Sequence, residues 1–256
     1  MDFDIEIVTL SRTGGRSYNE DAFGHWNDGQ HVVCVVADGA GGHGGGDVAS
    51  QVVRASVLGG FAERPGVDAQ LLRELVERAN LDVVARQSEG GRLAGMRSTV
   101  VLAAIDLPTQ RVAFAHCGDS RAYLFRGGRL LLRTVDHSLV QQMVTGGMLD
   151  EEGARSHPQR NMLLSALGSV EVAPDITVSP PLPLQVGDVL LLCTDGLWEP
   201  LDDDCLTELL AASRDAGGWV AQLDAQVRAR AKPGHDNYTA LVLWAREDDE
   251  TTRLLP

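Results

Sequence analysis

One stretch constrains the fold of this chain more than any other: an apolar run that ends in an aspartate and a glycine-rich turn. Residues 31–37 read His-Val-Val-Cys-Val-Val-Ala, and Asp38 and Gly39 follow them directly. A short run without polar interruption is typical of a strand buried on both faces. Such a strand holds its terminal carboxylate rigidly at the edge of the core, where a ligand can reach it. The glycines that follow let the backbone come close to whatever that carboxylate binds.

Two further aspartates occupy similar positions far downstream. Asp195 follows the apolar run 189–194, and Asp236 precedes the apolar run 238–244. Taken alone, an aspartate at a strand end is more often a turn residue or a helix cap. Three of them, each followed by Gly or Asn, favour a single metal site built from the whole chain. Ligands that are all oxygen atoms select hard cations such as Mg²⁺ or Mn²⁺.

The charge of the chain excludes several kinds of partner. The 256 residues include 36 acidic and 22 basic side chains, for a net charge of −14. An acidic surface repels phosphate backbones and anionic lipids, so we expect neither nucleic acid nor membrane as a partner. The acidic N-terminus indicates no signal peptide, and no apolar run approaches the roughly 20 residues of a membrane helix. The four cysteines show no metal-ligand spacing, which favours reduced, buried thiols in a cytoplasmic protein.

The periodicity of apolar residues predicts an α+β fold. Strands are expected at 3–10, 22–26, 31–37, 97–106, 111–117, 121–126, 129–133, 174–179, 188–194 and 237–245, and helices at 47–61, 71–84, 202–213 and 217–231. Each helix carries one apolar stripe. Two mainly antiparallel sheets packed face to face, with helix pairs outside, would bury every stripe. We therefore expect a four-layer αββα sandwich in one domain, residues 1–246, followed by a charged, disordered tail at 247–256 that frays from Arg246 onward.

The segment between Asp136 and Gly168 differs from its surroundings. It is polar, has weak periodicity and contains several glycines. We interpret it as short helices in a mobile insert over the site, with little burial.

Polar residues near the N-terminus could complete the site. Arg16 lies on a glycine-rich loop, and an arginine beside a carboxylate cluster can bind a phosphoryl group through two parallel hydrogen bonds. Taken alone, it is more often a solvated surface charge. Glu20 and Asp21 could hold metal-bound waters or simply cap local structure.

Eight motifs in this order resemble the metal-dependent type 2C (PPM) protein serine/threonine phosphatases, especially their compact bacterial members. Each motif alone is weak, but the series spans residues 7–245 and is very specific. In chain order they are Arg16-x-x-Asn19-Glu20-Asp21, Val36-Ala37-Asp38-Gly39-Ala40-Gly41-Gly42-His43, Ser98-Thr99, His116-Cys117-Gly118-Asp119-Ser120-Arg121-Ala122-Tyr123, Asp136-His137-Ser138, Ala166-Leu167-Gly168, Cys193-Thr194-Asp195-Gly196-Leu197-Trp198 and Asp236-Asn237-Tyr238-Thr239.

The resemblance implies a role for each matching residue. Asp38 would bridge two Mn²⁺ or Mg²⁺ ions, the Gly39 carbonyl would bind the second, and Asp195 and Asp236 would complete the first. Arg16 would bind the substrate phosphate, and Glu20 and Asp21 would act through metal-bound water. Asp119 would hold a weaker third ion together with Asp195, although a turn residue is the alternative. The polar segment, at residues 137–165, corresponds to the family's flap beside the substrate entrance.

The family's chemistry would be direct hydrolysis of phosphoserine and phosphothreonine by a bridging water, without a phosphoenzyme. Substrates would be phosphorylated proteins, and the enzyme would reverse a bacterial Ser/Thr kinase. A catalytically inactive, phosphoprotein-binding pseudophosphatase is the alternative, but no metal aspartate is replaced. A metal-dependent nuclease would use similar carboxylates, yet the net charge of −14 and the lack of a basic groove argue against it.

Two departures from the family pattern affect the chemistry and the substrate contacts. Eukaryotic members carry a histidine two residues after the bridging aspartate as a proposed general acid, and here that position is Ala40. We do not transfer that role to His43, so the source of the leaving-group proton is open. Residues 161–168 lack the Thr-Arg often seen before Ala-Leu-Gly, which predicts different substrate contacts near the flap.

Overall fold

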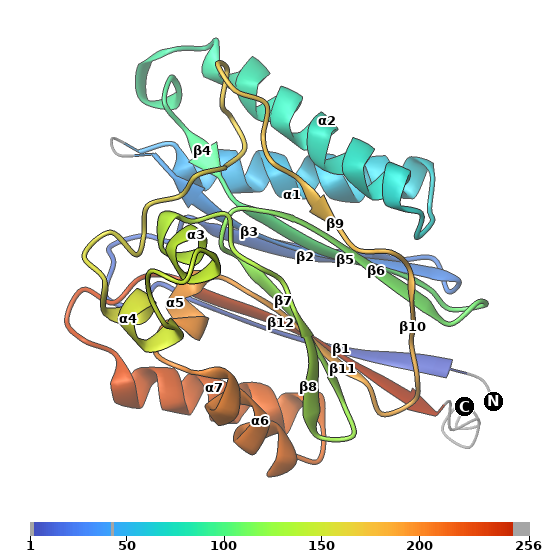
Figure 1. Cartoon of the computed structure of the whole chain (residues 1–256). Helices are drawn as coiled ribbons and strands as arrows, with labels where there is room; N and C mark the ends of the chain where they lie inside the picture. The colour runs from blue at the N-terminus through green and yellow to red at the C-terminus, as the bar shows by residue number, and fades with distance from the viewer. Residues whose placement is uncertain (1–2, 42–43, 248–256) are drawn as a thin grey trace.

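Two antiparallel β-sheets stacked face to face form the centre of the molecule in the computed structural model, which describes residues 3–41 and 44–247 (Figure 1). The first sheet has the order β10-β6-β5-β3-β2, with β4 paired to β3 and β9 to β6; the second has the order β1-β12-β11-β7-β8. The second sheet contains β1 (Phe3–Arg12), β7 (Arg121–Arg126), β8 (Arg129–Arg133), β11 (Val189–Cys193) and β12 (Tyr238–Glu247). The first sheet contains β2 (Asp21–Asn27), β3 (His31–Ala40), β4 (Arg97–Ser98), β5 (Val100–Asp106), β6 (Arg111–Cys117), β9 (Thr177–Val178) and β10 (Leu182–Pro183).

Helices cover the outer face of each sheet. The pair α1 (Gly46–Glu63) and α2 (Ala69–Gln87) packs on the first sheet, and α6 (Asp203–Ala211) and α7 (Ala216–Arg230) pack on the second (Figure 1). Shorter helical segments are η1 (Gly91–Leu93), α3 (Leu139–Thr145), α4 (Glu151–Ser156) and α5 (Asp195–Trp198). No described helix has the length and apolarity needed to cross a membrane.

Alternating side chains on the strands create three separate cores, as four layers require. On β3, Val33 and Val35 face α1 and α2, whereas Val32 and Cys34 face the other sheet. On β11, Leu191 faces α6 and α7. Because successive residues of a strand point to opposite faces, a strand buried on both faces reads as one continuous apolar run. The predicted αββα fold class is therefore confirmed, and the four cysteines are free and buried.

The helices begin where the sequence offers caps. Asp68, Asp202 and Asp215 precede α2, α6 and α7, and each side chain accepts a hydrogen bond from a backbone N–H in the first turn. Such N-caps satisfy backbone donors that have no partner within the helix. The four long helices match their predicted ranges to within a few residues.

Several predicted boundaries are wrong because contacts distant in sequence decide them. The predicted strand 97–106 is interrupted at Thr99, whose N–H donates to the Asp38 carbonyl. The strand expected at 174–179 is reduced to β9, and β10 was not predicted. The helix α5 begins at Asp195, directly after the predicted strand. At the C-terminus, Arg246 is paired with β1 rather than frayed, and it forms an ion pair with Glu6. The rest of the predicted tail, from residue 248, lies outside the described residues.

Candidate metal centre

The predicted site aspartates converge because antiparallel pairing brings strand ends together. The carboxyl end of β11 lies beside the amino end of β12, so Asp195 and Asp236 share one edge of the second sheet. In the first sheet, Asp21 at the start of β2 pairs with Asp38 near the end of β3. Asp119 lies in the turn that joins β6 of one sheet to β7 of the other. All five carboxylates thus come to the same end of the sandwich, because the strand ends and the turn that carry them meet there, at the end where α5 lies in Figure 1.

Asp38 lies within β3 rather than after it. The strand was predicted to end at residue 37, but it continues to Ala40 because Gly39 and Ala40 pair with the short strand β4. The Asp38 N–H donates to the Thr99 hydroxyl, 3.0 Å away. Both flanks of Asp38 are therefore held by backbone pairing, and the half-buried carboxylate has a defined position.

The neighbouring glycines leave room for close backbone contacts. A Cβ atom on Gly39 would lie 1.9 Å from the Gly46 carbonyl oxygen, and one on Gly46 would lie 2.2 Å from Glu20 Oε1. No side chain other than hydrogen fits at either position without moving backbone. The glycine-rich turn therefore allows the start of α1, the Gly39 peptide and the Glu20 carboxylate to approach one another.

Asn237 ties the Arg16 loop to this edge, a role that the sequence did not reveal. Its side-chain amide donates to the carbonyls of Thr13 and Tyr18, 2.9 and 3.0 Å away, and its Oδ1 accepts from the Glu20 N–H. These three bonds hold the loop that carries Arg16 against the start of β12. The Arg16 guanidinium is about half exposed and donates to Asp236 Oδ2 over 2.7 Å.

Several buried carboxylate oxygens have no hydrogen-bond partner within the described chain. Three of them, Oε1 of Glu20, Oδ1 of Asp21 and Oδ1 of Asp195, belong to the carboxylates at this end of the sandwich, and the other two are Oδ1 of Asp47 and Oδ1 of Asp203. The other oxygen of Asp21 accepts from the hydroxyls of Thr194 and Thr239. Buried polar atoms are almost always paired, so unpaired acceptors that cluster at one edge indicate a place for a cation or for ordered water.

Crowding of the carboxylates changes their acidity. Burial is the main cause that raises the pKa of Asp21 and of Asp119 to about 7. The pKa values of Asp38 and Asp195 lie well above the usual range, again through burial and then through repulsion by neighbouring carboxylates. Glu20 shifts in the same direction for the same reasons. A divalent cation would remove this repulsion and favour the ionised forms.

The donor set fits a hard divalent cation that keeps part of its water shell. Across residues 3–41 and 44–247, no three Asp, Glu, His or Cys side chains are arranged to hold one ion by themselves. Mg²⁺ usually keeps several waters and is bound through one or two carboxylates. The unpaired oxygens, the glycine contacts and the purely oxygen donor set are consistent with that mode.

Asp119 is buried, unlike a carboxylate in a solvated turn. It is 7% exposed, because the two sheets enclose the turn between β6 and β7. The Trp198 indole donates to the Asp119 carbonyl over 3.0 Å, so α5 packs against this turn. Asp119 is therefore placed next to the residues that follow Asp195.

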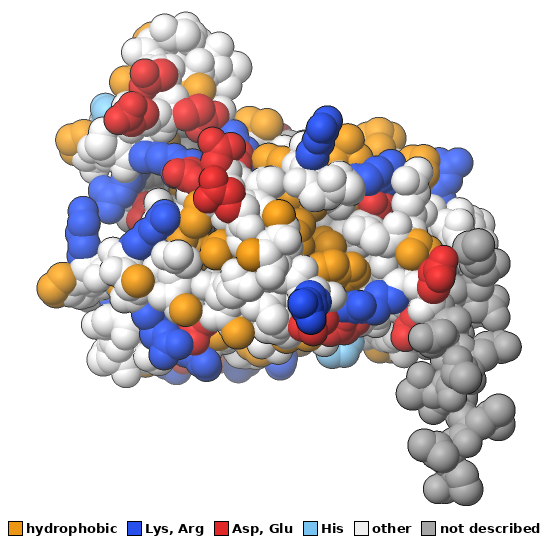
Figure 2. Space-filling model, turned by 90° about the horizontal axis from the view of Figure 1, so that it is seen from below, with side chains coloured by type: hydrophobic (Ala, Val, Ile, Leu, Met, Phe, Trp, Pro, Cys, Tyr) orange, Lys and Arg blue, Asp and Glu red, His pale blue; other side chains and the backbone are white. Residues whose placement is uncertain are grey.

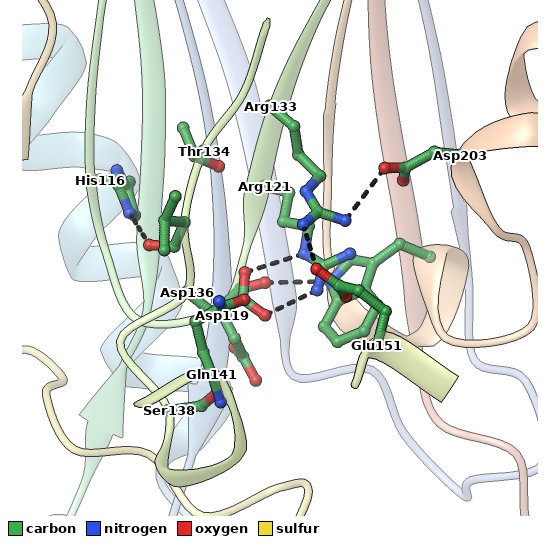
Figure 3. A network of polar contacts seen from close by, with 12 residues as sticks. His116, Asp119, Arg121, Arg133, Thr134, Asp136, Ser138, Gln141, Glu151 and Asp203 are labelled. Carbon is green, nitrogen blue, oxygen red and sulfur yellow. Dashed lines mark hydrogen bonds and ion pairs between the residues drawn. The ribbon is translucent and has the colours of Figure 1, made fainter. Parts of the chain in front are cut away.

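A buried ion pair lies beside the same turn (Figure 3). The Arg121 guanidinium donates two hydrogen bonds of 2.8 Å to the Asp136 carboxylate, and both side chains are almost completely buried. The Arg121 guanidinium carbon lies 3.5 Å from the centroid of the Trp198 ring, a cation–π contact. The pair joins β7 to the first residue of the polar segment and to α5.

The flap, residues 137–165, has the two short helices that the sequence indicated, α3 and α4. Within these helices only Val140 and Ala154 are buried, so the expected low burial is confirmed. Ion pairs hold the flap at its edges: Glu151 pairs with Arg133, and Arg160 pairs with Glu199.

His116 lies on β6 shortly before Asp119 and is 1% exposed. Its Nε2 donates to the Val135 carbonyl over 2.9 Å, and its ring stacks on His137 at a centroid distance of 4.6 Å. Burial lowers the pKa of His116 to about 4 from its ordinary value of 6.5. The folded protein therefore keeps this imidazole neutral, whereas the unfolded chain takes up a proton below pH 6.5.

This difference predicts acid sensitivity of the fold. Between pH 6.5 and about pH 4, His116 binds a proton in the unfolded chain but not in the folded protein. The folded state is therefore at its full stability above pH 6.5. The free energy of unfolding decreases as the pH falls from 6.5 toward about 4. Between about pH 7.5 and pH 5 the loss should be about 2 kcal/mol. Urea unfolding at these two pH values should show a smaller loss of unfolding free energy for His116→Gln than for the wild type. The exposed His25 serves as control, and equal losses in His25→Gln and His116→Gln would contradict the assignment.

Comparison with known proteins shows the family of this chain. The model of the family described as protein phosphatase 2C matches residues 11–228, and the chain belongs to this family. The chain is 37% identical over 211 residues to the serine/threonine protein phosphatase PstP of Mycobacterium tuberculosis, a match that covers 82% of the chain and 40% of that protein. It thus spans less than half the length of PstP. The serine/threonine phosphatase stp of Listeria monocytogenes is 34% identical, with 89% of this chain and 90% of stp covered.

A solved structure gives the same fold with metal bound. The catalytic domain of PstP, in complex with two manganese ions, superposes with a TM-score of 0.79 at 30% identity, covering 96% of this chain and all of that domain. The family and the fold class expected from the sequence are both confirmed.

Proposed function

We propose that this protein is a metal-dependent phosphatase that hydrolyses phosphoserine and phosphothreonine in proteins directly, without a phosphoenzyme. One observation carries the proposal: crowded carboxylates with unpaired oxygens lie beside an exposed arginine at one end of the sandwich. The names of the relatives PstP and stp, both serine/threonine phosphatases, support it.

The metal ligands are assigned as follows in this proposal. Asp38, Asp195 and Asp236 would hold one Mn²⁺ or Mg²⁺ ion, and Asp38 with the Gly39 carbonyl would hold a second. The described side chains are not yet placed for a three-carboxylate site, so metal binding would have to move at least one of these carboxylates, such as that of Asp236, which now accepts a hydrogen bond from Arg16. Glu20 and Asp21 would act through water. When bound, such a pair supplies an activated water at neutral pH and neutralises charge on the phosphoryl group. The two manganese ions in the PstP catalytic domain support this assignment.

The residues of the chain orient the substrate. Arg16 is positioned by the Asn237 bonds and presents an exposed guanidinium, which can donate two parallel hydrogen bonds to a phosphoryl group. The Arg16 guanidinium already donates a hydrogen bond to Asp236, so a bound phosphoryl group would compete with Asp236 for this donor. Ala40 offers no proton to the leaving oxygen. The His43 side chain lies outside the described residues, and we assign it no role.

Loss of Arg16 should weaken substrate capture. A charge-assisted bidentate contact is worth about 1.5–3 kcal/mol, so Arg16→Ala should lower kcat/KM by roughly 10- to 150-fold. A small aryl phosphate should show the same loss as a phosphopeptide, because the contact is made to the phosphoryl group. The nearby exposed Arg12 provides the control. An Arg16→Ala variant with the same kcat/KM as Arg12→Ala would contradict the assignment of Arg16 to the substrate phosphate.

Asp119 is proposed to hold a weaker third ion together with Asp195. The raised pKa of Asp119 reflects burial near Asp136, which a cation would offset. Asp119→Asn keeps the shape of this buried side chain, so we expect a folded protein that still binds the main pair of ions but turns over more slowly. The reduction should be greatest at low Mn²⁺. If Asp119→Asn matches the wild-type rate at every Mn²⁺ concentration, Asp119 holds no catalytic ion and serves only as a turn residue.

We assign residues 1–246 to a single catalytic domain in which the flap at 137–165 sets the choice of protein substrate. The substrates would be phosphorylated proteins, with a cognate Ser/Thr kinase or its targets as partners. An inactive pseudophosphatase is not favoured, because Asp38, Asp195 and Asp236 are all present.

Release of inorganic phosphate from a phosphothreonine peptide tests the activity. The purified chain should be inactive after chelation and should regain activity with Mn²⁺, while Asp38→Asn should stay inactive. Binding of the peptide without turnover at any Mn²⁺ concentration would favour the pseudophosphatase instead.

A further inference from the structure

A cavity of about 620 Å³ opens beside the candidate metal centre. Arg16 and Asp236 form one wall, α4 of the flap forms another, and Arg230 with residues 232–235 completes it. Sites for drug-sized ligands have volumes of about 300–1,000 Å³, so a short peptide segment can enter. Because Arg16 lines this cavity, a phosphoryl group bound there would place the neighbouring residues of the substrate inside it.

The cavity has an excess of positive charge in a chain whose net charge is −14. Each of its acidic side chains already has an arginine partner: Asp136 with Arg121, Glu151 with Arg133, Glu199 with Arg160 and Asp236 with Arg16. Figure 3 shows Glu151 directed toward Arg133. Three lining cations form no ion pair with any carboxylate in the described part of the chain: Arg155, Arg230 and Lys232.

These cations come from opposite sides of the cavity. Arg155 is a half-buried residue of α4, whereas Lys232 lies on the loop that leads to Asp236. Arg230, at the end of α7, donates to the Pro200 carbonyl, which holds its guanidinium at the rim. In Figure 2 several Lys and Arg side chains gather at the left end of the molecule, the end where Figure 1 places α4 and α5.

We propose that this cavity selects protein substrates that carry a second negative group within a few residues of the phosphorylated one. The inference rests on the proposed phosphatase function and adds the substrate class. The shared chemistry is an oxyanion, from either an acidic side chain or a second phosphorylated residue. Both pair with guanidinium and ammonium groups, and a phosphate pairs more strongly because it carries close to two charges.

Four phosphothreonine peptides that differ only beside the phosphothreonine test this preference. Their flanks are neutral, acidic, doubly phosphorylated or lysine-containing. The wild type should hydrolyse the acidic and doubly phosphorylated peptides with kcat/KM about tenfold higher than the neutral one, and the lysine peptide more slowly still. The advantage should shrink at high salt, because partly exposed charges are screened.

The double variant Arg155→Gln/Lys232→Gln should lose most of this advantage. The loss should appear in KM rather than in kcat, because a flanking contact is equal in the ground and transition states. A small aryl phosphate has no residues beside its phosphate, so the double variant should hydrolyse it at the wild-type rate. This control shows that the candidate metal centre is intact. The matched control is Arg129→Gln/Arg214→Gln, which removes two exposed arginines outside the cavity.

The outcomes separate this inference from the proposed function. Equal kcat/KM on all four peptides, or equal losses in the cavity and control variants, would overturn the inference and leave the phosphatase function standing. A wild type that releases phosphate from neither aryl phosphate nor peptides with Mn²⁺ would overturn the proposed function and the inference together. A peptide preference that only the cavity variant abolishes would support both.

Discussion

Asp38→Asn should slow phosphopeptide hydrolysis by at least about a thousandfold, since one preorganised electrostatic contact is commonly worth a hundred- to a thousandfold and this carboxylate is assigned to two ions. Asparagine has the same size as aspartate. The backbone of residue 38 keeps its hydrogen bond to the Thr99 hydroxyl, and Gly39 stays paired with Ser98. The loss would therefore report the charge rather than the fold. A rate near that of the wild type with Mn²⁺ would contradict the assignment of Asp38 as bridging ligand.

The same variant should be more stable than the wild type when metal is absent. Asp38 is crowded by Asp195 and Asp21, which together with burial raise its pKa well above the ordinary range. Removing the charge relieves this repulsion, and we expect metal-free Asp38→Asn to gain about 1 kcal/mol at neutral pH. With Mn²⁺ at about 100 times its Kd, the wild type should gain about 2.7 kcal/mol for each ion bound, and the variant much less. Asp82→Asn, on the exposed face of α2, should change neither value.

The second large effect concerns stability and comes from the buried pair of Arg121 and Asp136. Asp136→Ala should lower the free energy of unfolding by about 3–5 kcal/mol, because it leaves a buried guanidinium without its counter-ion. Chemical unfolding measures this directly. Replacing both partners, as in Arg121→Met/Asp136→Leu, should recover most of the loss, since a well-packed apolar pair avoids the cost of burying charge.

An exposed ion pair provides the comparison for this effect. Glu63 and Arg78 pair on the surface between α1 and α2, and water screens them. Glu63→Ala should therefore leave the unfolding curve almost unchanged. Similar losses in Glu63→Ala and Asp136→Ala would mean that burial does not control the strength of the Arg121 pair.

The parts of the fold that local patterns encode could be predicted from the sequence. The stripes of α1 and α2, and the apolar runs of β3 and β11, each specify a buried face within a few residues of chain. The strand-end aspartates Asp38, Asp195 and Asp236 could also be found, because each interrupts an apolar run where an edge of the core must lie. Antiparallel pairing then brings them together without further information.

Features that depend on distant contacts could not be predicted. Thr99 interrupts its strand because it bonds to Asp38, 61 positions away. Asn237 secures the loop around Tyr18 across 219 positions, a role that its place after Asp236 in the sequence did not reveal. Asp119 reads as a turn carboxylate in Gly-Asp-Ser, but the stacking of two sheets buries it. Arg121 reads as a strand charge, although Asp136 and Trp198 enclose it.

Equilibrium dialysis against Mn²⁺ shows, without relying on activity, whether the converging carboxylates form a two-metal centre. We expect the metal-free wild type to bind two ions tightly, with a third only at higher concentration, and Asp38→Asn to lose tight binding of both. A wild type that binds no Mn²⁺, or an Asp38→Asn variant that binds it as tightly as the wild type does, would rule out a two-metal centre bridged by Asp38.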